Sequence, residues 1–265
     1  MAMVPSRITS RQHPVVQRFR RLAARRRNDR GLLLDGEHLV GEALDAGVAI
    51  DLLLSDGRTP DLADRARASG ATVYLASAPV LEAASPVRSP TGTVAIASWM
   101  PAGVRDLFTR TPALVIGLLD VQDPGNAGSV VRSADALGAT GVAMLDRTAD
   151  PAGWRALRGA MGSTFRLPIA RASSAEVLAE ARRATVRVAA TVADDGQPVE
   201  TCDLTSPVVV LLGNEGAGLP TDIVAQADSR ITIPMRSGVD SLNVAVTAAL
   251  ILYEARRQRR VEPTR

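Results

Sequence analysis

The chain has 265 residues, a hydrophobic fraction of 46% and a formal net charge of only +3, so its core-forming material excludes an intrinsically disordered protein. No apolar run approaches the roughly 20 residues that a membrane-spanning helix needs, and the N-terminus has no apolar core of the signal-peptide type. The single cysteine, Cys202, excludes an internal disulfide and favours a cytoplasmic protein, while the absence of lysine excludes Schiff-base chemistry and Walker-type phosphate loops.

The first 30 residues are strongly basic, with nine arginines against one acid, Asp29. Apolar residues at helical spacing between 15 and 27 predict an amphipathic helix whose outer face is rich in arginine. A second basic run, ARRQRRVEPTR, ends the sequence. Basic ends on a nearly neutral body favour a polyanionic partner such as nucleic acid, although a solvated helix face would also explain one such run.

Residues 30–98 alternate between short strand and helix patterns. Strands are expected at 32–34, 50–56, 71–77 and 92–98, and helices at 37–46, 60–70 and 79–85. This alternation predicts one compact α/β unit, which we place at 1–98 together with the basic helix. The following segment, 99–112, has two prolines and a glycine and is predicted to be an interdomain linker.

A second alternating series fills residues 113–265 and predicts a second α/β domain. Strands are expected at 114–121, 141–145, 167–170, 186–192, 207–212 and 230–234, and helices at 127–137, 151–160, 174–184, 219–227 and 241–258. Several of these strands, such as PVVVLLG, are continuously apolar. That pattern is typical of a parallel sheet covered on both faces.

The first segment with unexpected polar residues is 118–142, where a strand runs into Asp-Pro-Gly-Asn and a helix follows. Asn126 is predicted to cap this helix at its N-terminus, and Gly138 to cap its C-terminus. Arg132 is harder to explain structurally, because it places a guanidinium among small apolar residues. It is therefore a candidate functional residue.

The second such segment is 208–220, in which an apolar strand ends in Gly-Asn-Glu-Gly-x-Gly. In an open α/β sheet, ligands bind at the carboxyl ends of strands, where this loop would lie. The loop has neither the Lys-Ser/Thr pair of a phosphate loop nor a G-x-G-x-x-G pattern, so a phosphate is disfavoured while an adenosyl ligand remains open. Glu215 is either a determinant for that ligand or a carboxylate at the start of a helix.

The third segment, 231–258, combines a strand, a proline, a flexible RSGVD loop and a long helix starting near Ser241. Asp240 or Ser241 is expected to cap this helix. Asn243 falls in the first turn among apolar residues, where a buried amide would need hydrogen-bond partners.

Taken in order, these segments resemble the three signature motifs of the SpoU (TrmH) family of RNA methyltransferases, in the SPOUT superfamily. The matches are N-A-G-x-x-x-R at 126–132, G-N-E-G-x-G at 213–218, and I-P-M followed by S-L-N-V at 233–235 and 241–244. The front half, with its SRQHP…GLLLDGEHLV opening, resembles the ribosomal-protein-L30-like substrate-binding domain that many members carry.

The resemblance implies an α/β catalytic domain with a parallel sheet and a deep trefoil knot, and a homodimer whose sites lie near the subunit interface. The knot loops, around 211–218 and 232–242, would hold S-adenosylmethionine. Residues at the motif positions are expected to bind this cofactor: Leu212, Gly213, Asn214, Glu215, Gly216, Gly218, Ile233, Met235, Ser241 and Leu242. Nothing in the sequence requires a metal, since no cluster of possible ligands surrounds His13 or His38.

The resemblance also implies methylation of a ribose 2'-hydroxyl in RNA. The residues at positions linked to catalysis or to substrate and cofactor placement are Arg132, Asn126, Glu215, Ser241 and Asn243. Because arginine is almost always protonated, Arg132 is expected to stabilise developing alkoxide charge or to orient a phosphate rather than to act as a general base. A neighbouring phosphate or water would then take the proton.

The basic helix is expected to contact RNA phosphates through Arg18, Arg21, Arg25, Arg26 and Arg27. Aromatic residues are scarce, so recognition of a folded RNA by its backbone and shape is favoured over base stacking. The extra front domain favours 23S ribosomal RNA over transfer RNA as the substrate. The alternatives are a transfer-RNA enzyme, a non-catalytic RNA-binding or ribosome-assembly factor, and a small-molecule methyltransferase on a classical Rossmann sheet.

Overall fold

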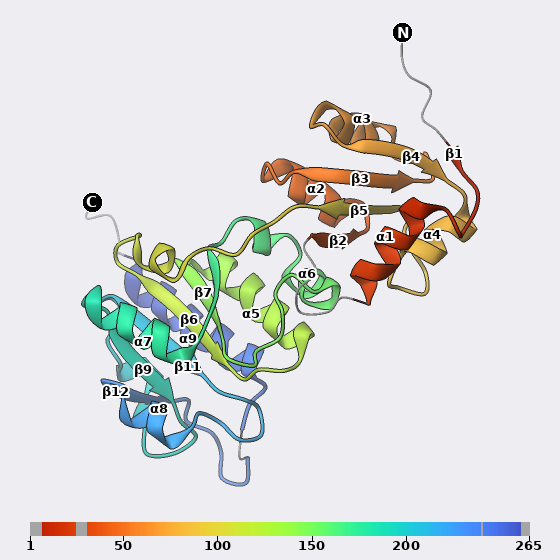
Figure 1. Cartoon of the computed structure of the whole chain (residues 1–265). Helices are drawn as coiled ribbons and strands as arrows, with labels where there is room; N and C mark the ends of the chain where they lie inside the picture. Colours follow the sequence, from red (N-terminus) through yellow and green to blue (C-terminus); the bar gives the residue numbers. More distant parts are fainter. Residues whose placement is uncertain (1–6, 25–30, 240, 261–265) are drawn as a thin grey trace. The chain divides into compact units, whose positions relative to one another are not determined.

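The structure is a computed structural model of the whole chain, and it describes residues 7–24, 31–239 and 241–260 (Figure 1). The chain divides into two compact units. The first unit comprises Met1–Met100 and Ala152–Phe165, and the second comprises Pro101–Pro151 and Arg166–Arg265.

The first unit is built on a mixed five-stranded sheet with the order β1-β4-β3-β5-β2. Its strands are β1 (Arg7–Ile8), β2 (Leu32–Asp35), β3 (Ile50–Ser55), β4 (Thr72–Ala76) and β5 (Thr93–Ala97). Strands β1 and β3 run parallel to β4, whereas β5 is antiparallel to both β3 and β2. The predicted front strands are all present; the two-residue β1 was too short to leave a sequence pattern.

Helices cover both faces of this sheet. They are α1 (Pro14–Ala23), α2 (Glu37–Asp45), α3 (Pro60–Ala68), α4 (Ala78–Ala84), α6 (Trp154–Ala160) and the 3₁₀ turn η2 (Ser163–Phe165). Residues of α1 and α4 share one buried cluster with Leu52 and Ile96, while residues of α2 and α3 share another with Leu53 and Ala95. Because successive strand residues point to opposite faces, these two clusters are the two sides of one sheet.

Helix α1 shows why the N-terminal arginines stay at the surface. Val16 and Phe19 are fully buried, whereas Arg18, Arg20 and Arg21 are exposed. The helix begins at Pro14, whose missing N–H is of no cost there, and the Nδ1 atom of His13 accepts a hydrogen bond from the Val15 N–H at 3.2 Å.

The second unit contains a seven-stranded sheet in which every pairing is parallel, with the order β10-β12-β9-β11-β6-β7-β8. Its strands are β6 (Leu114–Leu119), β7 (Gly141–Leu145), β8 (Ile169–Ala172), β9 (Arg187–Thr191), β10 (Gln197–Pro198), β11 (Val208–Leu212) and β12 (Ser229–Thr232). All residues of the central strands β6 and β11 are buried, as expected for a parallel sheet covered on both faces.

Helices α5 (Pro124–Leu137) and α9 (Val244–Arg259) pack against each other. Helix α7 (Ser174–Arg183), helix α8 (Thr221–Ala225) and the 3₁₀ helix η1 (Val104–Phe108) share a buried cluster with β6, β7, β9 and β11. A third 3₁₀ turn, η3 (Val199–Thr201), contacts α9. Figure 1 shows α7 in front of the sheet and α9 behind it.

Two segments differ from the sequence-based expectation. Residues 104–108, within the predicted linker, form η1, and Leu107 is fully buried in the core of the second unit. The helix expected at 151–160 forms as α6, but Leu157 belongs to the buried cluster of the first unit. Both differences arise from tertiary packing of apolar side chains, which local patterns do not reveal.

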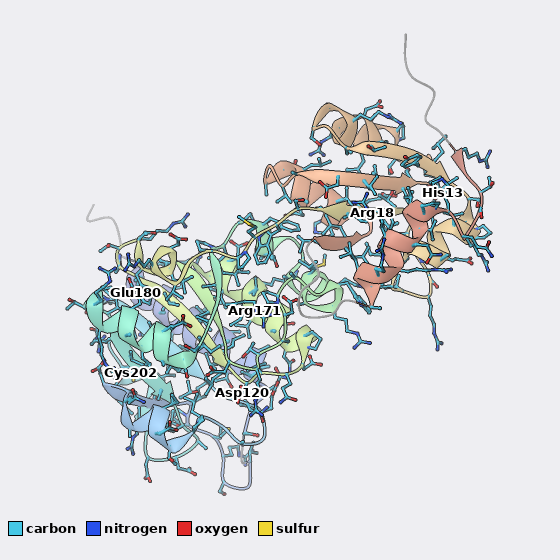
Figure 2. The ribbon with its side chains drawn as sticks, viewed as in Figure 1. His13, Arg18, Asp120, Arg171, Glu180 and Cys202 are labelled. Carbon is cyan, nitrogen blue, oxygen red and sulfur yellow. The ribbon has the colours of Figure 1, made fainter. Side chains whose placement is uncertain are left out.

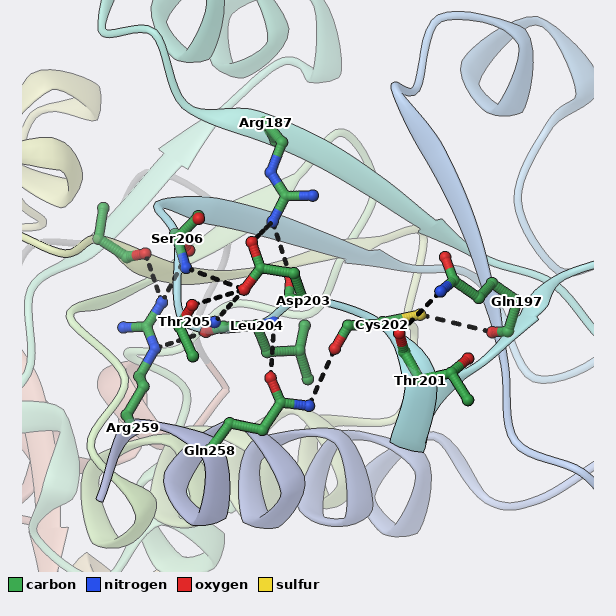
Figure 3. Close-up of polar contacts among 11 residues, drawn as sticks. Arg187, Gln197, Thr201, Cys202, Asp203, Leu204, Thr205, Ser206, Gln258 and Arg259 are labelled. Atoms are coloured by element: carbon green, nitrogen blue, oxygen red, sulfur yellow. Dashed lines mark hydrogen bonds and ion pairs between the residues drawn. The ribbon is translucent and has the colours of Figure 1, made fainter. Parts of the chain in front are cut away.

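The C-terminal end of α9 is fastened to the loop that precedes β11 (Figure 3). The Arg259 guanidinium donates hydrogen bonds to four backbone carbonyl groups, those of Leu204 (2.7 Å), Pro112 (2.9 Å), Ala113 (3.1 Å) and Ser206 (3.1 Å). Burial lowers the pKa of this guanidinium below its usual value. We call this arrangement the Arg259 clasp.

Cys202 lies beside the clasp, and its contacts are those of a residue with a structural role. Its thiol lies 3.4 Å from the Pro198 carbonyl oxygen, and Gln258 donates a hydrogen bond to its backbone carbonyl at 2.9 Å. Burial raises the pKa of the thiol, so the reactive thiolate is disfavoured.

In the described part of the chain, no helix is long and apolar enough to cross a membrane.

Candidate active site

A pocket of about 390 Å³ opens at the carboxyl ends of β9, β11 and β12. This is where ligands bind in open parallel sheets. All ten residues predicted to contact a cofactor lie on its wall: Leu212, Gly213, Asn214, Glu215, Gly216, Gly218, Ile233, Met235, Ser241 and Leu242. Residues 191–193, the last residue of β9 and the two that follow it, also line the pocket, and no sequence motif had marked them.

The loop 213–218 is held in shape by Asn214. Its Oδ1 atom accepts hydrogen bonds from the Gly216 N–H (2.9 Å) and the Ala217 N–H (3.2 Å), and its Nδ2 donates to the Asp120 carbonyl at 3.0 Å. The backbone closes on itself, because the Gly218 N–H donates to the Asn214 carbonyl at 2.9 Å. The loop is therefore held by its own hydrogen bonds and by one to Asp120, the residue that follows β6.

Position 213 requires glycine because the backbone of residues 218 and 219 approaches it closely. A Cβ atom at 213 would lie 2.2 Å from the Gly218 carbonyl carbon and 2.4 Å from the Leu219 nitrogen, and both of these are backbone atoms. Since neither can move without opening the loop, only glycine fits at 213.

Three side chains from distant parts of the sequence form a hydrogen-bonded chain next to the pocket. Asn126 Nδ2 donates to Glu215 Oε1 at 2.7 Å, and Asn243 Nδ2 donates to Asn126 Oδ1 at 3.1 Å. These residues come from α5, the 213–218 loop and the start of α9. The structure thus brings together three of the five residues predicted for catalysis.

The prediction that Asn126 caps α5 is wrong. The cap is Asp123, whose carboxylate accepts a hydrogen bond from the Asn126 N–H at 2.7 Å, and Pro124 occupies the first helical position. Because Asp123 satisfies the helix end, the Asn126 side chain remains available to bridge Glu215 and Asn243. The prediction that Gly138 ends the helix is confirmed by its left-handed conformation, with φ of 87°.

The start of α9 also differs from expectation. Asn243 caps the helix by accepting a hydrogen bond from the Ala245 N–H at 2.9 Å, so α9 begins at Val244 rather than near Ser241. Asp240, the other expected cap, lies outside the described residues. Asn243 is exposed rather than buried, and Ser241 is exposed on the pocket wall. The helix end fixes Asn243, which leaves its Nδ2 atom for Asn126.

Arg132 does not join this cluster. It is exposed on α5 and is not part of the pocket wall, and its guanidinium has no hydrogen-bond or ion-pair partner among the described residues. The structure therefore presents Arg132 as a free cation on the helix that carries Asn126.

The pocket wall is mostly apolar, and among its described residues Glu215 is the only ionisable side chain. Because the described wall carries one carboxylate and no cation, it suits a positively charged ligand and disfavours a ligand that carries phosphates. The apolar wall, with the hydroxyls of Thr191, Thr232 and Ser241, suits a flat aromatic group with polar edges. Across the described residues, no cluster of His, Cys, Asp and Glu side chains could hold a metal ion.

Asp120, at the end of β6, supports the pocket and had no sequence signal of its own (Figure 2). Its backbone is left-handed, with φ of 56°, and its carbonyl accepts the hydrogen bond from Asn214. The carboxylate accepts hydrogen bonds from the Arg147 N–H (2.9 Å) and the Arg147 guanidinium (3.0 Å). The hydrogen bond from the guanidinium holds the pKa of Asp120 below its usual value.

The predicted RNA contacts of the first unit fall on α1. Arg18, labelled in Figure 2, and Arg21 are exposed. Among the residues that the structure describes, neither has a hydrogen-bond or ion-pair partner. Arg25, Arg26 and Arg27 lie outside the described residues.

Comparisons of the sequence and of the structure with known proteins all find RNA methyltransferases. Residues 113–253 match the SpoU rRNA Methylase family. The chain is 36% identical to the 23S rRNA (uridine(2479)-2'-O)-methyltransferase of Streptomyces viridochromogenes, over 96% of this chain and 92% of that protein. It is 33% identical to the 23S rRNA (guanosine(2553)-2'-O)-methyltransferase of Bacillus subtilis, over 84% and 88% respectively. The crystal structure of an AdoMet-bound rRNA methyltransferase from Sinorhizobium meliloti matches with a TM-score of 0.88 and 34% identity, covering 95% of this chain and 97% of that one.

Proposed function

Because this chain belongs to the SpoU rRNA methylase family, we propose that it methylates the 2'-oxygen of a ribose in structured RNA, with S-adenosylmethionine as the methyl donor. One observation carries the proposal: the Glu215–Asn126–Asn243 chain adjoins a pocket lined by all ten residues expected to hold the cofactor. The S. meliloti relative binds AdoMet in its crystal structure, which supports the choice of cofactor.

The pocket fits this cofactor by its chemistry. S-adenosylmethionine supplies an electrophilic methyl group on a positively charged sulfonium. The apolar wall around Leu212 and Ile233 would hold the adenine, and Glu215 would supply the negative charge that a cationic ligand favours. The Asn214 hydrogen bonds keep the 213–218 loop in one shape, so little ordering remains to be done when a ligand binds.

The residues around the pocket would position the attacking hydroxyl. Asn126 fixes the Glu215 carboxylate and is itself fixed by Asn243, so three elements define the place of one carboxylate. Arg132, as a permanently protonated group, would bind an RNA phosphate or stabilise negative charge developing on the ribose oxygen. The proton would pass to a phosphate or to water.

We favour 23S ribosomal RNA as the substrate. The two relatives named for 23S rRNA match this chain over 96% and 84% of its length, so the match includes the front half. In this proposal the first unit, Met1–Met100 with Ala152–Phe165, is the RNA-binding domain, and the second unit is the catalytic domain. Binding through exposed arginines such as Arg18 and Arg21 should weaken steeply as salt rises.

We also propose a cytoplasmic homodimer with a knotted catalytic domain. The knot is supported by the way the loop 213–218 lines one pocket together with Ile233, Met235, Ser241 and Leu242. The dimer is supported by an apolar stripe on α9, formed by Val246, Leu250 and Tyr253, which are 47%, 43% and 63% exposed.

The test is transfer of labelled methyl from S-adenosylmethionine to 23S rRNA and, separately, to transfer RNA. We expect transfer to 23S rRNA, and a loss of about 100-fold or more in Arg132→Ala with cofactor affinity unchanged. Arg110→Ala is the matched control, because Arg110 is also exposed in the second unit and has no partner among the described residues.

Full activity in Arg132→Lys would refute a specific guanidinium role. Methylation of transfer RNA alone would show that the substrate is transfer RNA and not 23S rRNA. Tight RNA binding without any transfer would favour a non-catalytic assembly factor.

A further inference from the structure

A second depression, of about 340 Å³, lies in the first unit between α1 and the sheet. Helix α1 contributes Arg18, Arg21 and Leu22, and β5 contributes Ile96. Gly31, Asp51 of β3 and Ser98, which follows β5, also line it. No motif in the sequence had marked Asp51, Ile96 or Ser98.

The charged groups of this depression are exposed to solvent and make few bonds to other described residues. Arg18 and Arg21 have no hydrogen-bond or ion-pair partner among the described residues. Asp51 only accepts hydrogen bonds from the Ser98 hydroxyl, at 3.2 and 3.4 Å. Two guanidinium groups and one carboxylate thus line the same depression without pairing with each other. By contrast, Arg20 on the same helix donates to the Ala83 carbonyl at 3.1 Å.

Each part of the lining suits one part of a nucleotide. Two guanidinium groups are the usual binding site for a phosphate. The half-buried Leu22 offers apolar surface for the face of a base, to which the almost fully buried Ile96 adds only the small part of its side chain that stays exposed. The Asp51 carboxylate can only accept hydrogen bonds, and guanine is the one common base with two adjacent donors, N1–H and N2–H, on its Watson–Crick edge.

We propose that this depression binds a single unpaired guanosine nucleotide of the RNA substrate, with its phosphate on Arg18 and Arg21 and its base edge on Asp51. The inference rests on the proposed function, which identifies the ligand as a segment of the RNA substrate. It adds recognition of a base to a surface that was expected to recognise only the RNA backbone and its shape. The volume of about 340 Å³ lies at the lower end of the range for small-ligand pockets, which suits one nucleotide.

The proposal makes a prediction opposite in sign to simple electrostatics. Asp51→Asn removes a negative charge from a surface that binds a polyanion, so charge alone would strengthen RNA binding. Base recognition predicts weaker binding, because an amide replaces one of the two acceptor oxygens of the carboxylate with a donor, which opposes a donor of guanine. Asp61→Asn removes the same charge from an exposed position of the first unit outside the depression, and it is the matched control.

The measurement is the affinity of the full-length protein for three labelled pentaribonucleotides, UUGUU, UUIUU and UUAUU, where I is inosine and lacks the N2 amine. We expect UUGUU to bind about tenfold more tightly than the other two, as loss of one hydrogen bond to a charged group implies. Asp51→Asn should erase this preference while Asp61→Asn keeps it. Arg18→Gln and Arg21→Gln should weaken all three ligands, and Arg88→Gln, at an exposed arginine of the same unit, should have the smaller effect.

Equal affinities for the three pentanucleotides, or tighter binding by Asp51→Asn, would overturn the proposal. Tighter binding of free GMP than of UUGUU would overturn its RNA source and indicate a free nucleotide instead.

The methyl-transfer assay separates this inference from the proposed function. If the wild-type protein methylates 23S rRNA, Asp51→Asn should raise KM for the RNA and leave kcat unchanged. A guanosine preference without methyl transfer would support the nucleotide site in this depression and refute the proposed function. Methyl transfer without a guanosine preference would support the proposed function and refute the nucleotide site.

Discussion

At the scale of single residues, the cofactor pocket depends on a backbone conformation that ordinary side chains avoid. Asp120 is left-handed, and this conformation directs its carbonyl toward Asn214. The Arg147 hydrogen bonds to its carboxylate stabilise that arrangement. Asp120 is thus a positioning residue that acts on the pocket through Asn214.

We expect Asp120→Asn to weaken S-adenosylmethionine binding about 3- to 10-fold, because asparagine tolerates the left-handed backbone but loses the ion pair with Arg147. The Kd can be measured by calorimetry on the full-length protein. Asp135→Asn is the control, since its ion pair with Arg166 has a similar length, 2.9 Å against 3.0 Å, and lies away from the pocket wall. An equal loss in both variants would contradict a positioning role.

The pH dependence of this support follows from the lowered pKa of Asp120. A carboxyl group whose pKa is lower in the folded state contributes stability above its unfolded pKa of about 3.9 and loses it as pH falls through the folded value. The support therefore persists at neutral pH and is lost only in acid.

At the scale of elements, the two ends of α9 have different tasks. Its N-terminus presents Asn243 to Asn126, and its C-terminus is held by the Arg259 clasp. The basic run at the end of the sequence had favoured a polyanionic partner, but its described arginines largely have internal partners: Arg256 donates to the Ala136 carbonyl and Arg257 pairs with Glu254. Basic composition there reflects the fastening of a helix.

We expect Arg259→Met to lower the free energy of unfolding by about 1–3 kcal/mol, because four carbonyl groups lose their donor while the apolar stem is kept. Chemical denaturation followed by circular dichroism measures the change. Arg260→Met removes a neighbouring exposed arginine outside the clasp and should stay within about 0.5 kcal/mol of the wild type. Similar losses in both variants would show that the clasp contributes no stability of its own.

At the scale of the whole molecule, the proposed dimer depends on α9. Val246, Leu250 and Tyr253 recur at intervals of four and three residues, so they lie on one face of the helix. We expect the wild-type protein to sediment as a dimer and Leu250→Glu to sediment as a monomer, because a buried unpaired carboxylate at an interface is strongly unfavourable.

Met100→Glu places the same charge on another exposed apolar side chain, outside α9, and should remain dimeric. A monomeric wild-type protein, or a dimeric Leu250→Glu variant, would show that this face of α9 is not the interface.

Local patterns in the sequence were enough to predict the alternation of strands and helices, the parallel character of the second sheet and the motif residues that line the pocket. These follow from local signals: continuously apolar strands, glycines in a tight loop, and polar residues just after strands. The sequence did not determine which side chains cap the helices, since Asp123 and Asn126 both suit an N-cap and only the Glu215 contact distinguishes them. Nor did it reveal the Arg259 clasp, the Asp120 support or the depression at Asp51, because each joins residues far apart in the chain. Such contacts exist only once the sheet order has set which strand ends become neighbours.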